Sequence, residues 1–368
     1  MRRAVLALLC SLLAGLAHAE GFRDPQDGAF DASDYLLERK GFLPVPILIT
    51  EPAVGYGGGA MLLFFSESMA EANAHAKETG IMQPPNITGV GGMATENGTW
   101  GAGLFHFRTW GGDRYRYLGG LGKINLNTNY YGVSDQPRAY ELDGWGLVQQ
   151  LLVKLGDSRW FVGPRYTYFD LDTRFTGAIA NELGNISRDL AVGKAGLVID
   201  YDSRDNMFYP TRGSYMEIEA QAARDWLGSS RDFDTYELRA FTWLPLDKTW
   251  NLGLRIDGRA TDGDVPFYAQ PFVSLRGLPK GRYQDQYTLT GEMELRWTFV
   301  PRWSVLAFGG VGRAWGHWQD FSDADDAWGA GVGFRYLIAR KLGLAVGIDV
   351  ARSQDDNAFY FQVGSAWH

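Results

Sequence analysis

The chain has 368 residues, with 35 basic and 43 acidic side chains and a formal net charge of −8 at pH 7. This acidic balance disfavours nucleic acid as a partner. The 47 glycines, 13 tryptophans, 18 tyrosines and 21 phenylalanines are typical of many short strands with aromatic residues at two membrane interfaces.

The first residues have the form of a secretory signal peptide. Arg2 and Arg3 precede an apolar run, and Ala17-His-Ala19 provides a small-x-small cleavage site. We therefore predict that residues 1–19 are removed on export. The only cysteine, Cys10, lies in this segment, so the exported chain has no thiol for a disulfide, a nucleophile or a metal ligand.

Residues 20–41 are polar and turn-rich, and they are too few to bury a core of their own. We expect them to form a short periplasmic segment ahead of a barrel that spans residues 42–368. No exported segment approaches the roughly 18 consecutive apolar residues of a membrane-spanning helix.

Alternating residues predict strands along the remainder of the chain. In Gly291–Phe299, charged residues at 292, 294 and 296 oppose apolar residues at 293, 295, 297 and 299. A soluble barrel with one charged and one apolar face would have no dry core, whereas a membrane barrel turns the apolar face to lipid and the charges to a wet lumen. We therefore predict an all-β, transmembrane antiparallel barrel in the bacterial outer membrane. A soluble periplasmic all-β domain is the alternative.

Turn signals divide the barrel into about sixteen strands, an even number that leaves both ends in the periplasm. The expected strands lie near 43–50, 54–66, 86–96, 99–110, 114–128, 142–155, 159–172, 190–201, 213–226, 231–245, 249–262, 287–298, 303–314, 328–338, 342–352 and 357–367. In the fifth strand Arg114 and Arg116 share a face but Lys123 falls opposite, which predicts a bulge at Gly119–Gly122. Residues 67–79 are expected to form a short surface helix.

The stretch Asp202-Ser-Arg-Asp-Asn-Met-Phe-Tyr-Pro-Thr-Arg-Gly213 is expected between the eighth and ninth strands, on the periplasmic side. Its residues suit a tight turn, because Asp and Asn accept backbone N–H bonds, Pro fixes its own φ and Gly permits positive φ. The candidate residues of this turn are Asp202, Arg204, Asp205, Asn206, Tyr209, Pro210, Thr211, Arg212 and Gly213. We expect their role to be structural.

A second motif, Ser274-Leu-Arg-Gly-Leu-Pro-Lys-Gly-Arg-Tyr283, lies in the connection between the eleventh and twelfth strands. This connection runs from Gly263 to Gln286 and is extracellular by strand parity. Loops of this length are usually functional or disordered.

Both motifs resemble signatures of the surface-antigen superfamily of outer-membrane barrels, which includes BamA, TamA and FhaC. The resemblance implies that the long loop folds back into the lumen, where the arginine of a Val-Arg-Gly-Phe/Tyr motif pairs with acidic residues on the barrel wall. The matching residues are Leu275, Arg276, Gly277 and Leu278, so a leucine replaces the aromatic residue. We predict Glu292 and Glu294, on the lumen face of the next strand, as the anchor of the guanidinium. A solvated surface arginine is the alternative.

The resemblance also bears on the junction of the first and last strands. Pro44 and Pro46 remove two hydrogen-bond donors from the first strand, and in BamA-like barrels this seam acts as a lateral gate. The predicted seam residues are Pro44, Pro46, Leu48 and Gly364. The alternative is that the prolines only mark where the chain enters the barrel.

The end of the chain resembles the signal by which the barrel-assembly machinery recognises its clients. Phe359, Phe361, Val363 and Trp367 are expected to share one face of the last strand. The resemblance implies that this protein is a client of that machinery.

Two functions remain open at this stage. Relatives that insert or translocate proteins usually carry POTRA modules, for which residues 20–41 are too short, whereas barrels fused behind patatin-like lipases lack them. The first hypothesis is a barrel that moves or inserts protein or lipid through its lumen or seam, in contact with outer-membrane lipids and with a separately encoded periplasmic partner. The second is a passive diffusion channel or a structural protein with a lumen lined by Glu217, Glu219, Arg239, Arg255, Glu292 and Arg296.

An enzyme is not expected. A barrel hydrolase needs a Ser–His pair oriented by a third residue, and His75, His106, His317 and His368 lie in no such motif. The aspartates at 320, 323, 325 and 326 lack the glycine and late glutamate of a calcium loop. We predict no metal and no cofactor, and the oligomeric state stays open.

Overall fold

The computed structural model describes residues 22–38, 41–66, 86–132, 136–176 and 187–367. The expected signal peptide (1–19), the expected helix at 67–79, His75 and His368 lie outside the described residues. No helix in these ranges is both long enough and apolar enough to cross a bilayer.

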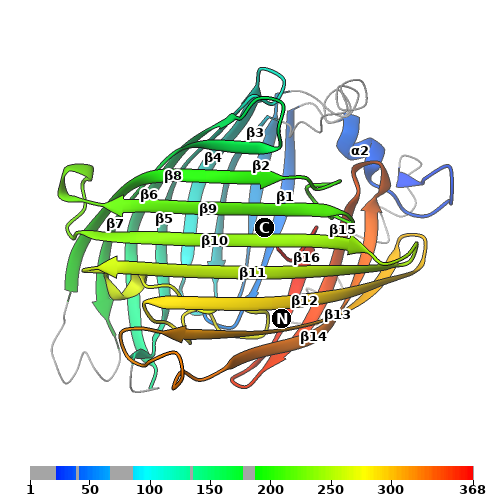
Figure 1. Cartoon of the computed structure of the whole chain (residues 1–368). Coiled ribbons are helices and arrows are strands. Elements are labelled where there is room, and N and C mark those ends of the chain that lie inside the picture. Colours follow the sequence, from blue (N-terminus) through cyan, green and yellow to red (C-terminus); the bar gives the residue numbers. More distant parts are fainter. Residues whose placement is uncertain (1–21, 39–40, 67–85, 133–135, 177–186, 368) are drawn as a thin grey trace.

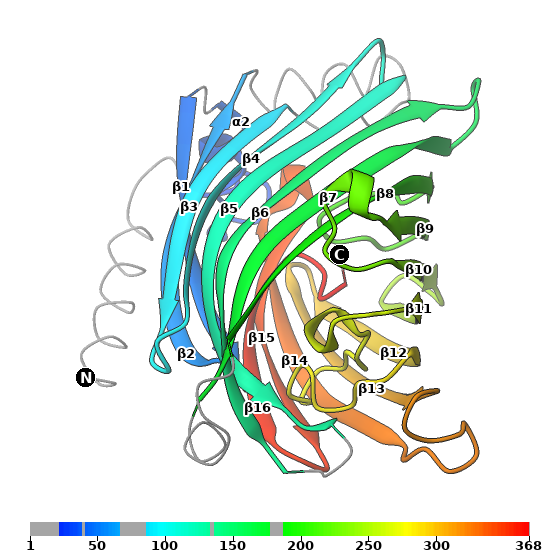
Figure 2. The same cartoon turned by 90° about the vertical axis from the view of Figure 1, so that its left-hand side faces the viewer.

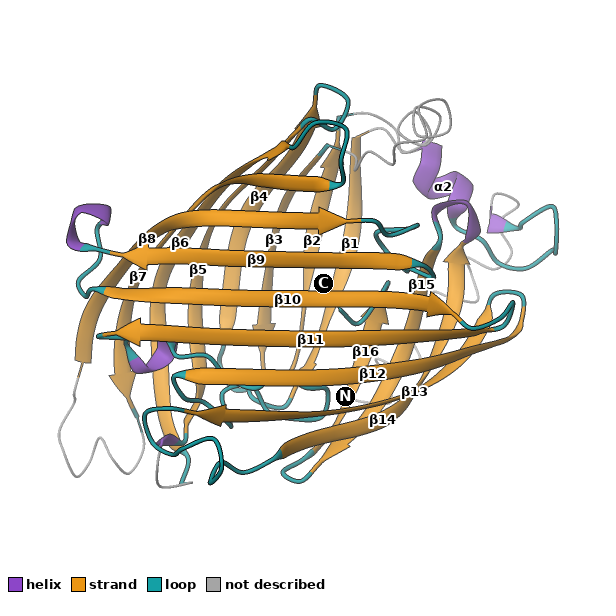
Figure 3. Ribbon diagram, in the orientation of Figure 1, coloured by secondary structure: helices purple, strands orange, loops and turns teal. Residues whose placement is uncertain are grey.

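Sixteen antiparallel strands follow one another around a single sheet, which confirms the predicted barrel (Figures 1 and 3). The strands are β1 (Gly41–Glu51), β2 (Gly55–Phe65), β3 (Ile87–Thr95), β4 (Trp100–Trp110), β5 (Tyr115–Tyr130), β6 (Arg138–Lys154), β7 (Trp160–Phe175), β8 (Ser187–Asp202), β9 (Gly213–Ala223), β10 (Phe233–Pro245), β11 (Trp250–Gly263), β12 (Tyr287–Val300), β13 (Trp303–Trp315), β14 (Ala327–Ala339), β15 (Leu344–Ser353) and β16 (Asn357–Val363). The described helical elements are α2 (Ser33–Glu38) and the short 3-10 turns η3 (Asp225–Leu227), η4 (Phe267–Ala269) and η5 (Arg340–Leu342).

The two faces of the wall differ as the alternation predicted. On β12 the apolar side chains of Met293 and Trp297 are 53% and 41% exposed, whereas Glu292 and Arg296 are each 4% exposed. The apolar residues therefore form the lipid-facing surface, and the charged residues are buried inside the barrel.

The bulge expected at Gly119–Gly122 is absent, so that prediction was wrong. The ladders from β5 to β4 and to β6 continue through these glycines without a register shift. Lys123 lies on the same face as the exposed Leu121, and its Nζ is 3.4 Å from Asp143 on β6. Lys123 therefore lies on the opposite face from Arg116 in a strand that stays in register.

The first and last strands do not pair in the way that their neighbours do. In the described residues each strand from β2 to β15 is hydrogen-bonded to both of its sequence neighbours, whereas no ladder joins β1 to β16. We call the junction of β1 and β16 the seam.

Candidate functional site: the lumen loop and the seam

The long loop between β11 and β12 lies inside the barrel (Figure 2). Val273, Leu275 and Leu278 are buried together with Ala314 of β13 and Ala327 of β14. Leu278, the leucine in place of the family's aromatic residue, is thus part of this apolar contact with the wall.

Arg276 is the polar anchor of the loop. Its Nε donates to Glu292 Oε1 over 2.8 Å, and its Nη1 lies 3.0 Å from Glu294 Oε2. These are the two carboxylates expected from the sequence. The guanidinium carbon is also 3.5 Å from the centroid of the Phe308 ring, so a ring from β13 provides the aromatic contact that Leu278 cannot.

A third carboxylate that contacts Arg276 was not predicted from the sequence. Asp349 on β15 is fully buried, and its Oδ2 accepts a hydrogen bond from Arg276 Nη1 over 2.9 Å. Asp349 also accepts from Arg335 of β14, which is 1% exposed. Alternation could have identified Asp349, because it lies between Ile348 and Val350, which face outward at 48% and 56% exposure.

The first half of the loop reaches across the lumen to the opposite wall. The Phe267 ring packs edge-on against Tyr130 of β5 and Tyr140 of β6, with centroid distances of 4.9 and 5.1 Å. It also stacks on Phe175 of β7 at 5.4 Å. Since the second half is held by β12 to β15, the loop spans the lumen at the end that strand parity assigns to the cell exterior.

A continuous set of ion pairs lines the lumen wall from β15 to β7. Successive members lie on the same strand, on strands no more than two apart, or on the loop, and each acid contacts at least one base. In order, the set comprises Asp349, Arg276, Glu292, Arg255, Asp257, Arg259, Glu237, Arg239, Glu217, Arg165 and Glu219. Five of the six residues that the sequence predicts along the lumen belong to this set, and the sixth, Arg296, is buried but lies outside it.

The Asp202–Gly213 connection forms a hydrogen-bonded turn at the end of the barrel that strand parity assigns to the periplasm. The Asp205 carboxylate accepts the backbone N–H groups of Thr211 and Arg212 over 2.9 and 3.1 Å. Gly213 has φ +101°, a conformation that favours glycine.

This turn also connects distant parts of the barrel. Arg296 of β12 donates to the Pro210 carbonyl over 2.9 Å and lies 4.0 Å from the centroid of the Tyr209 ring. The Asn206 amide donates to the Leu342 carbonyl over 2.7 Å. Within the turn itself, Arg204 pairs with Asp202 over 2.8 Å. These contacts favour a structural role for the turn.

The C-terminal residues correct one expectation. Phe359, Phe361 and Val363 face outward and are 42–45% exposed, but Trp367 is 4% exposed and does not share their face. β16 ends at Val363, and Gly364 has φ +81°. The chain turns inward at this glycine, so the alternation that placed Trp367 beside Phe361 ends there.

The inward turn places Trp367 in the lumen, and the C-terminal end lies within the barrel in both views (Figures 1 and 2). Its indole Nε1 donates to Glu292 Oε2 over 3.0 Å, so the C-terminal tail and the loop arginine share one carboxylate. Its rings lie 6.1 and 6.0 Å from those of Phe241 and Trp243 on β10. A Cβ on Gly253 would lie 2.7 Å from this indole, so the glycine makes room for Trp367.

At the seam, side chains and the loop take the place of a ladder. The Gly277 amide donates to Tyr360 Oη on β16 over 2.9 Å, and Lys280 Nζ lies 4.0 Å from Glu51 at the end of β1. On the outer face the Tyr56 and Phe359 rings stack at 5.7 Å. The loop that carries Arg276 therefore touches both edges of the seam.

Two residues of β1 have no backbone N–H group to donate. The β1–β2 ladder continues from Gly41 to Glu51 without a register shift through Pro44 and Pro46, which have no N–H to donate. We infer that the two proline nitrogens face the other edge, toward β16, since a missing donor on the β2 side would interrupt that ladder. Leu48, on the same strand, is 46% exposed.

A large cavity opens at the end of the lumen that strand parity assigns to the periplasm. It measures about 1490 Å³ and is bordered by the turns at 111–114, 156–159 and 202–205, with Arg165, Glu217 and Arg239 at its inner wall. No group of three or more His, Cys, Asp or Glu side chains that could hold a metal ion occurs in the part of the chain that the structure describes.

Comparison with solved structures finds a similar fold in three proteins. BamA from Haemophilus ducreyi lacking POTRA domains 1–3 is 12% identical, with a TM-score of 0.60, and the match covers 89% of this chain and 70% of that one. CdiB from Acinetobacter baumannii (11% identity, TM-score 0.57) matches 88% of this chain and 59% of its own. CdiB from Escherichia coli (12% identity, TM-score 0.59) matches 87% of this chain and 61% of its own.

At such low identity these structures establish the fold alone, and this chain spans only about three-fifths of either CdiB chain. No curated protein matches the sequence. Residues 123–367, however, match the Omp85 superfamily domain. The chain is an outer-membrane β-barrel that belongs to the Omp85 superfamily.

Proposed function

We propose that this barrel moves or inserts protein or lipid through the seam between β1 and β16. The observation that carries the proposal is the contrast within one sheet: fifteen neighbouring strand pairs form ladders, and β1 and β16 form none. An edge of unpaired backbone groups offers hydrogen bonds to another extended chain. An opened seam would also face the lipids of the outer membrane, which are the second class of molecule that it could admit.

The arrangement of the lumen supports passage toward the seam. The loop from Gly263 to Gln286 spans the extracellular part of the lumen, where it is held by Arg276 and by Phe267. The cavity of about 1490 Å³ lies at the periplasmic end. A molecule that enters from the periplasm thus meets the loop before the cell exterior, and the loop borders the seam through Gly277 and Lys280.

The loss of two donors at Pro44 and Pro46 supports a seam that opens at low cost. A typical intramolecular hydrogen bond contributes roughly 0.5–1.5 kcal/mol net. A seam with no ladder, in a barrel whose other strand pairs are ladders of 7 to 16 residues, is therefore the junction that separates most readily.

A passive diffusion channel is the second candidate, favoured by the volume of the periplasmic cavity. The two candidates differ in planar-bilayer conductance. A barrel whose loop is anchored by three carboxylates is expected to pass little steady current as wild type, whereas a channel conducts steadily. A steady wild-type conductance would favour the channel.

The direct test is photo-crosslinking in cells from a reactive residue at position 48. Leu121 on β5 provides a matched control, because it is equally exposed at 46% but belongs to a strand that is paired on both sides. We expect capture of other outer-membrane proteins or of lipid in excess at position 48. Equal adducts at both positions, or adducts only with this protein's own β16, would refute the proposal.

Two further expectations remain proposals. The exposed row of Phe359, Phe361 and Val363 is the part of the C-terminal strand that the barrel-assembly machinery would recognise. A separately encoded periplasmic partner would deliver substrate at the periplasmic turns.

A further inference from the structure

The segment before β1 is folded and bound to the barrel. Residues 22–31 form a tight hairpin in which the Phe22 and Phe30 rings stack at 5.6 Å, and Gly28 N–H bonds to the Asp24 carbonyl over 2.8 Å. Helix α2 (Ser33–Glu38) follows. Sequence reasoning predicted only a short polar segment here, because the contacts that fix it come from residues about 300 positions away.

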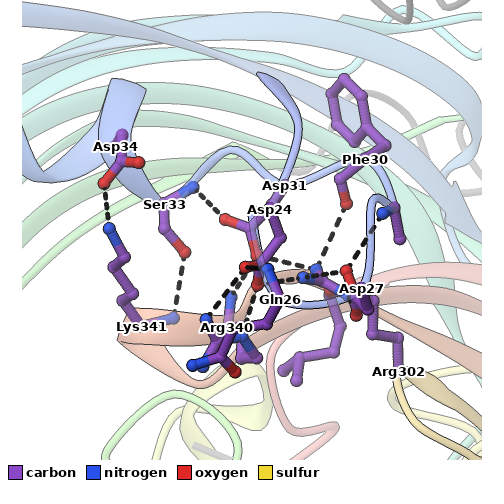
Figure 4. Close-up of polar contacts among 12 residues, drawn as sticks. Asp24, Gln26, Asp27, Phe30, Asp31, Ser33, Asp34, Arg302, Arg340 and Lys341 are labelled. Carbon is purple, nitrogen blue, oxygen red and sulfur yellow. Dashed lines mark hydrogen bonds and ion pairs between the residues drawn. The ribbon is translucent and has the colours of Figure 1, made fainter. Parts of the chain in front are cut away.

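Arg302, in the turn between β12 and β13, is the centre of this attachment (Figure 4). Three aspartates of the segment surround its guanidinium: Nη2 is 2.5 Å from Asp24, Nε is 2.5 Å from Asp27 and Nη1 is 2.7 Å from Asp31. Arg302 is 5% exposed and has φ +77°. A non-glycine residue in this conformation is costly, so the contacts of its side chain must compensate for the strain.

The turn between β14 and β15 provides a second set of contacts. Arg340 pairs with Asp24, and Lys341 pairs with Asp34. The Ala32 amide donates to the Ile338 carbonyl over 2.7 Å, and the Lys341 amide donates to Ser33 Oγ over 3.0 Å. Leu37 is buried against Ala339 and Leu342. Ion pairs, backbone hydrogen bonds and apolar contacts therefore all attach this segment to the barrel.

The topology makes this attachment a connection across the seam. The segment is bound to the turns β12–β13 and β14–β15, yet the chain continues directly into β1, on the far side of β16. Three peptide units separate Glu38 at the end of α2 from Gly41 at the start of β1, a span of at most about 11 Å. The periplasmic end of β1 is thus tied to β14 and β15 while no ladder ties it to β16.

We propose that residues 22–38 form a strap that holds the periplasmic end of the seam closed, and that the seam separates fully only when the strap leaves Arg302. This inference rests on the proposed function of the seam. Leu37, Arg340 and Lys341 also border the periplasmic cavity, so an arriving substrate meets the strap before it reaches the seam.

The charged and titratable groups that face one another in the attachment are Asp24, Asp27, Asp31 and Asp34 from the strap, Arg302 from the β12–β13 turn, the neutral phenol of Tyr336 from β14, and Arg340 and Lys341 from η5. The hydrogen bond from Arg340 lowers the pKa of Asp24 to about 2, and the hydrogen bond from Arg302 lowers the pKa of Asp27. Burial opposes the shift at Asp31, but hydrogen bonds to Ser33, Arg340 and Arg302 keep its pKa below the ordinary value.

These shifts fix the sign of the pH dependence. Carboxyls with lowered pKa values in the folded state stabilise the attachment above the pKa of the free carboxyl, about 4, and this stabilisation is lost as the pH falls toward 2. The strap should therefore stay attached from neutral pH to about pH 4, and mild acidification to pH 5 should not release it.

The test uses the full chain in liposomes, in a Cys10→Ser background, with two separate readouts. Strap attachment is measured as the rate at which a maleimide modifies a cysteine at position 37 (Leu37→Cys). Seam closure is measured as the yield of a short bifunctional thiol reagent across Tyr56→Cys and Phe359→Cys. The release variant combines Asp24→Asn, Asp27→Asn and Asp31→Asn. The matched control is Asp247→Asn, an aspartate of the β10–β11 turn whose hydrogen bonds within the described part of the chain go to Thr249 and Trp250.

In the release variant we expect modification at position 37 to rise by about tenfold or more, and the seam yield to fall at least about twofold, with no change in the control. A disulfide between Ser33→Cys and Lys341→Cys should restore the seam yield in the release variant. If position 37 of the release variant reacts faster but the seam yield is unchanged, the strap does not hold the seam closed. If position 37 of the release variant reacts as slowly as in the wild type, the three aspartates do not hold the strap. Either result would overturn the proposal. Neither readout requires a substrate, so failure of the proposed transport function would appear separately, as absence of capture at Leu48.

Discussion

The wall around β5 and β6 and the seam at β1 and β16 are made of the same alternating strands, yet they are held together in different ways. β5 and β6 pair over 16 residues from Tyr115 to Tyr130. At the seam, single contacts from Tyr360, Lys280 and Tyr56 replace the ladder. Backbone ladders therefore fix most of the barrel, while the closure of the seam depends on the loop and the strap that cross it.

The largest effect is expected from removal of the loop arginine. Arg276→Ala leaves Glu292, Glu294 and Asp349 buried without this counter-charge, which typically costs about 3–5 kcal/mol. Unfolding in urea, followed by heat modifiability on gels, should report the lost stability, and bilayer conductance should rise as the loop detaches. Arg313→Ala is the control, since Arg313 at the end of β13 contacts, among the described residues, Asp326 and Phe321 of the exposed loop that follows. Equal stability of the two variants would contradict the anchoring role.

The second-largest loss of stability is expected from substitution of Trp367. Trp367→Ala empties a buried site between Glu292 and the β10 aromatics, with an expected loss of about 3–5 kcal/mol. Trp367→Phe keeps most of the ring but removes the N–H donor, with a loss of about 1–3 kcal/mol. Urea midpoints of the two variants separate packing from hydrogen bonding. Wild-type stability of Trp367→Ala would mean that the tail contributes nothing to the lumen.

A smaller effect, opposite in sign, is expected at the β1 edge. Pro44→Val with Pro46→Val returns two N–H donors to the edge that faces β16, at about 0.5–1.5 kcal/mol for each bond that forms. Amide hydrogen exchange in β1 should slow, and capture from position 48 should fall. Faster exchange in β1 would show instead that the prolines stabilise this strand.

The smallest effect is expected on the outer wall. Lys123→Gln removes a 3.4 Å pair in which both side chains are largely exposed, at 56% and 40%, so the expected loss is below about 0.5 kcal/mol. The urea midpoint should stay at the wild-type value. A large loss would place Lys123 in a tighter network than its exposure indicates.

Much of the barrel could be predicted because the side-chain period of a strand is two. That period predicted the inward positions of Glu292, Glu294 and Arg296 and the outward positions of Met293 and Trp297, as the structure has them. It also led to the wrong position for Trp367, since Gly364 turns the chain inward and ends the period.

Contacts between distant segments were the part that could not be predicted. Asp349 lies 73 residues from Arg276, and Asp24 lies 278 residues from Arg302. In the sequence, an acidic residue that faces water cannot be distinguished from one that contacts an arginine. The family resemblance led to Arg276, but neither it nor the alternation gave a reason to place Asp24, Asp27 and Asp31 around one guanidinium.

The most direct test of the seam is capture from position 48 with the seam locked and unlocked in the same protein. A Tyr56→Cys, Phe359→Cys variant joins β2 to β16 across β1, and a reducible cross-link makes the lock reversible. The account predicts that adducts with other outer-membrane proteins or lipid disappear when the link is formed and return when it is reduced. Equal capture in the locked and reduced states would contradict a function at the seam.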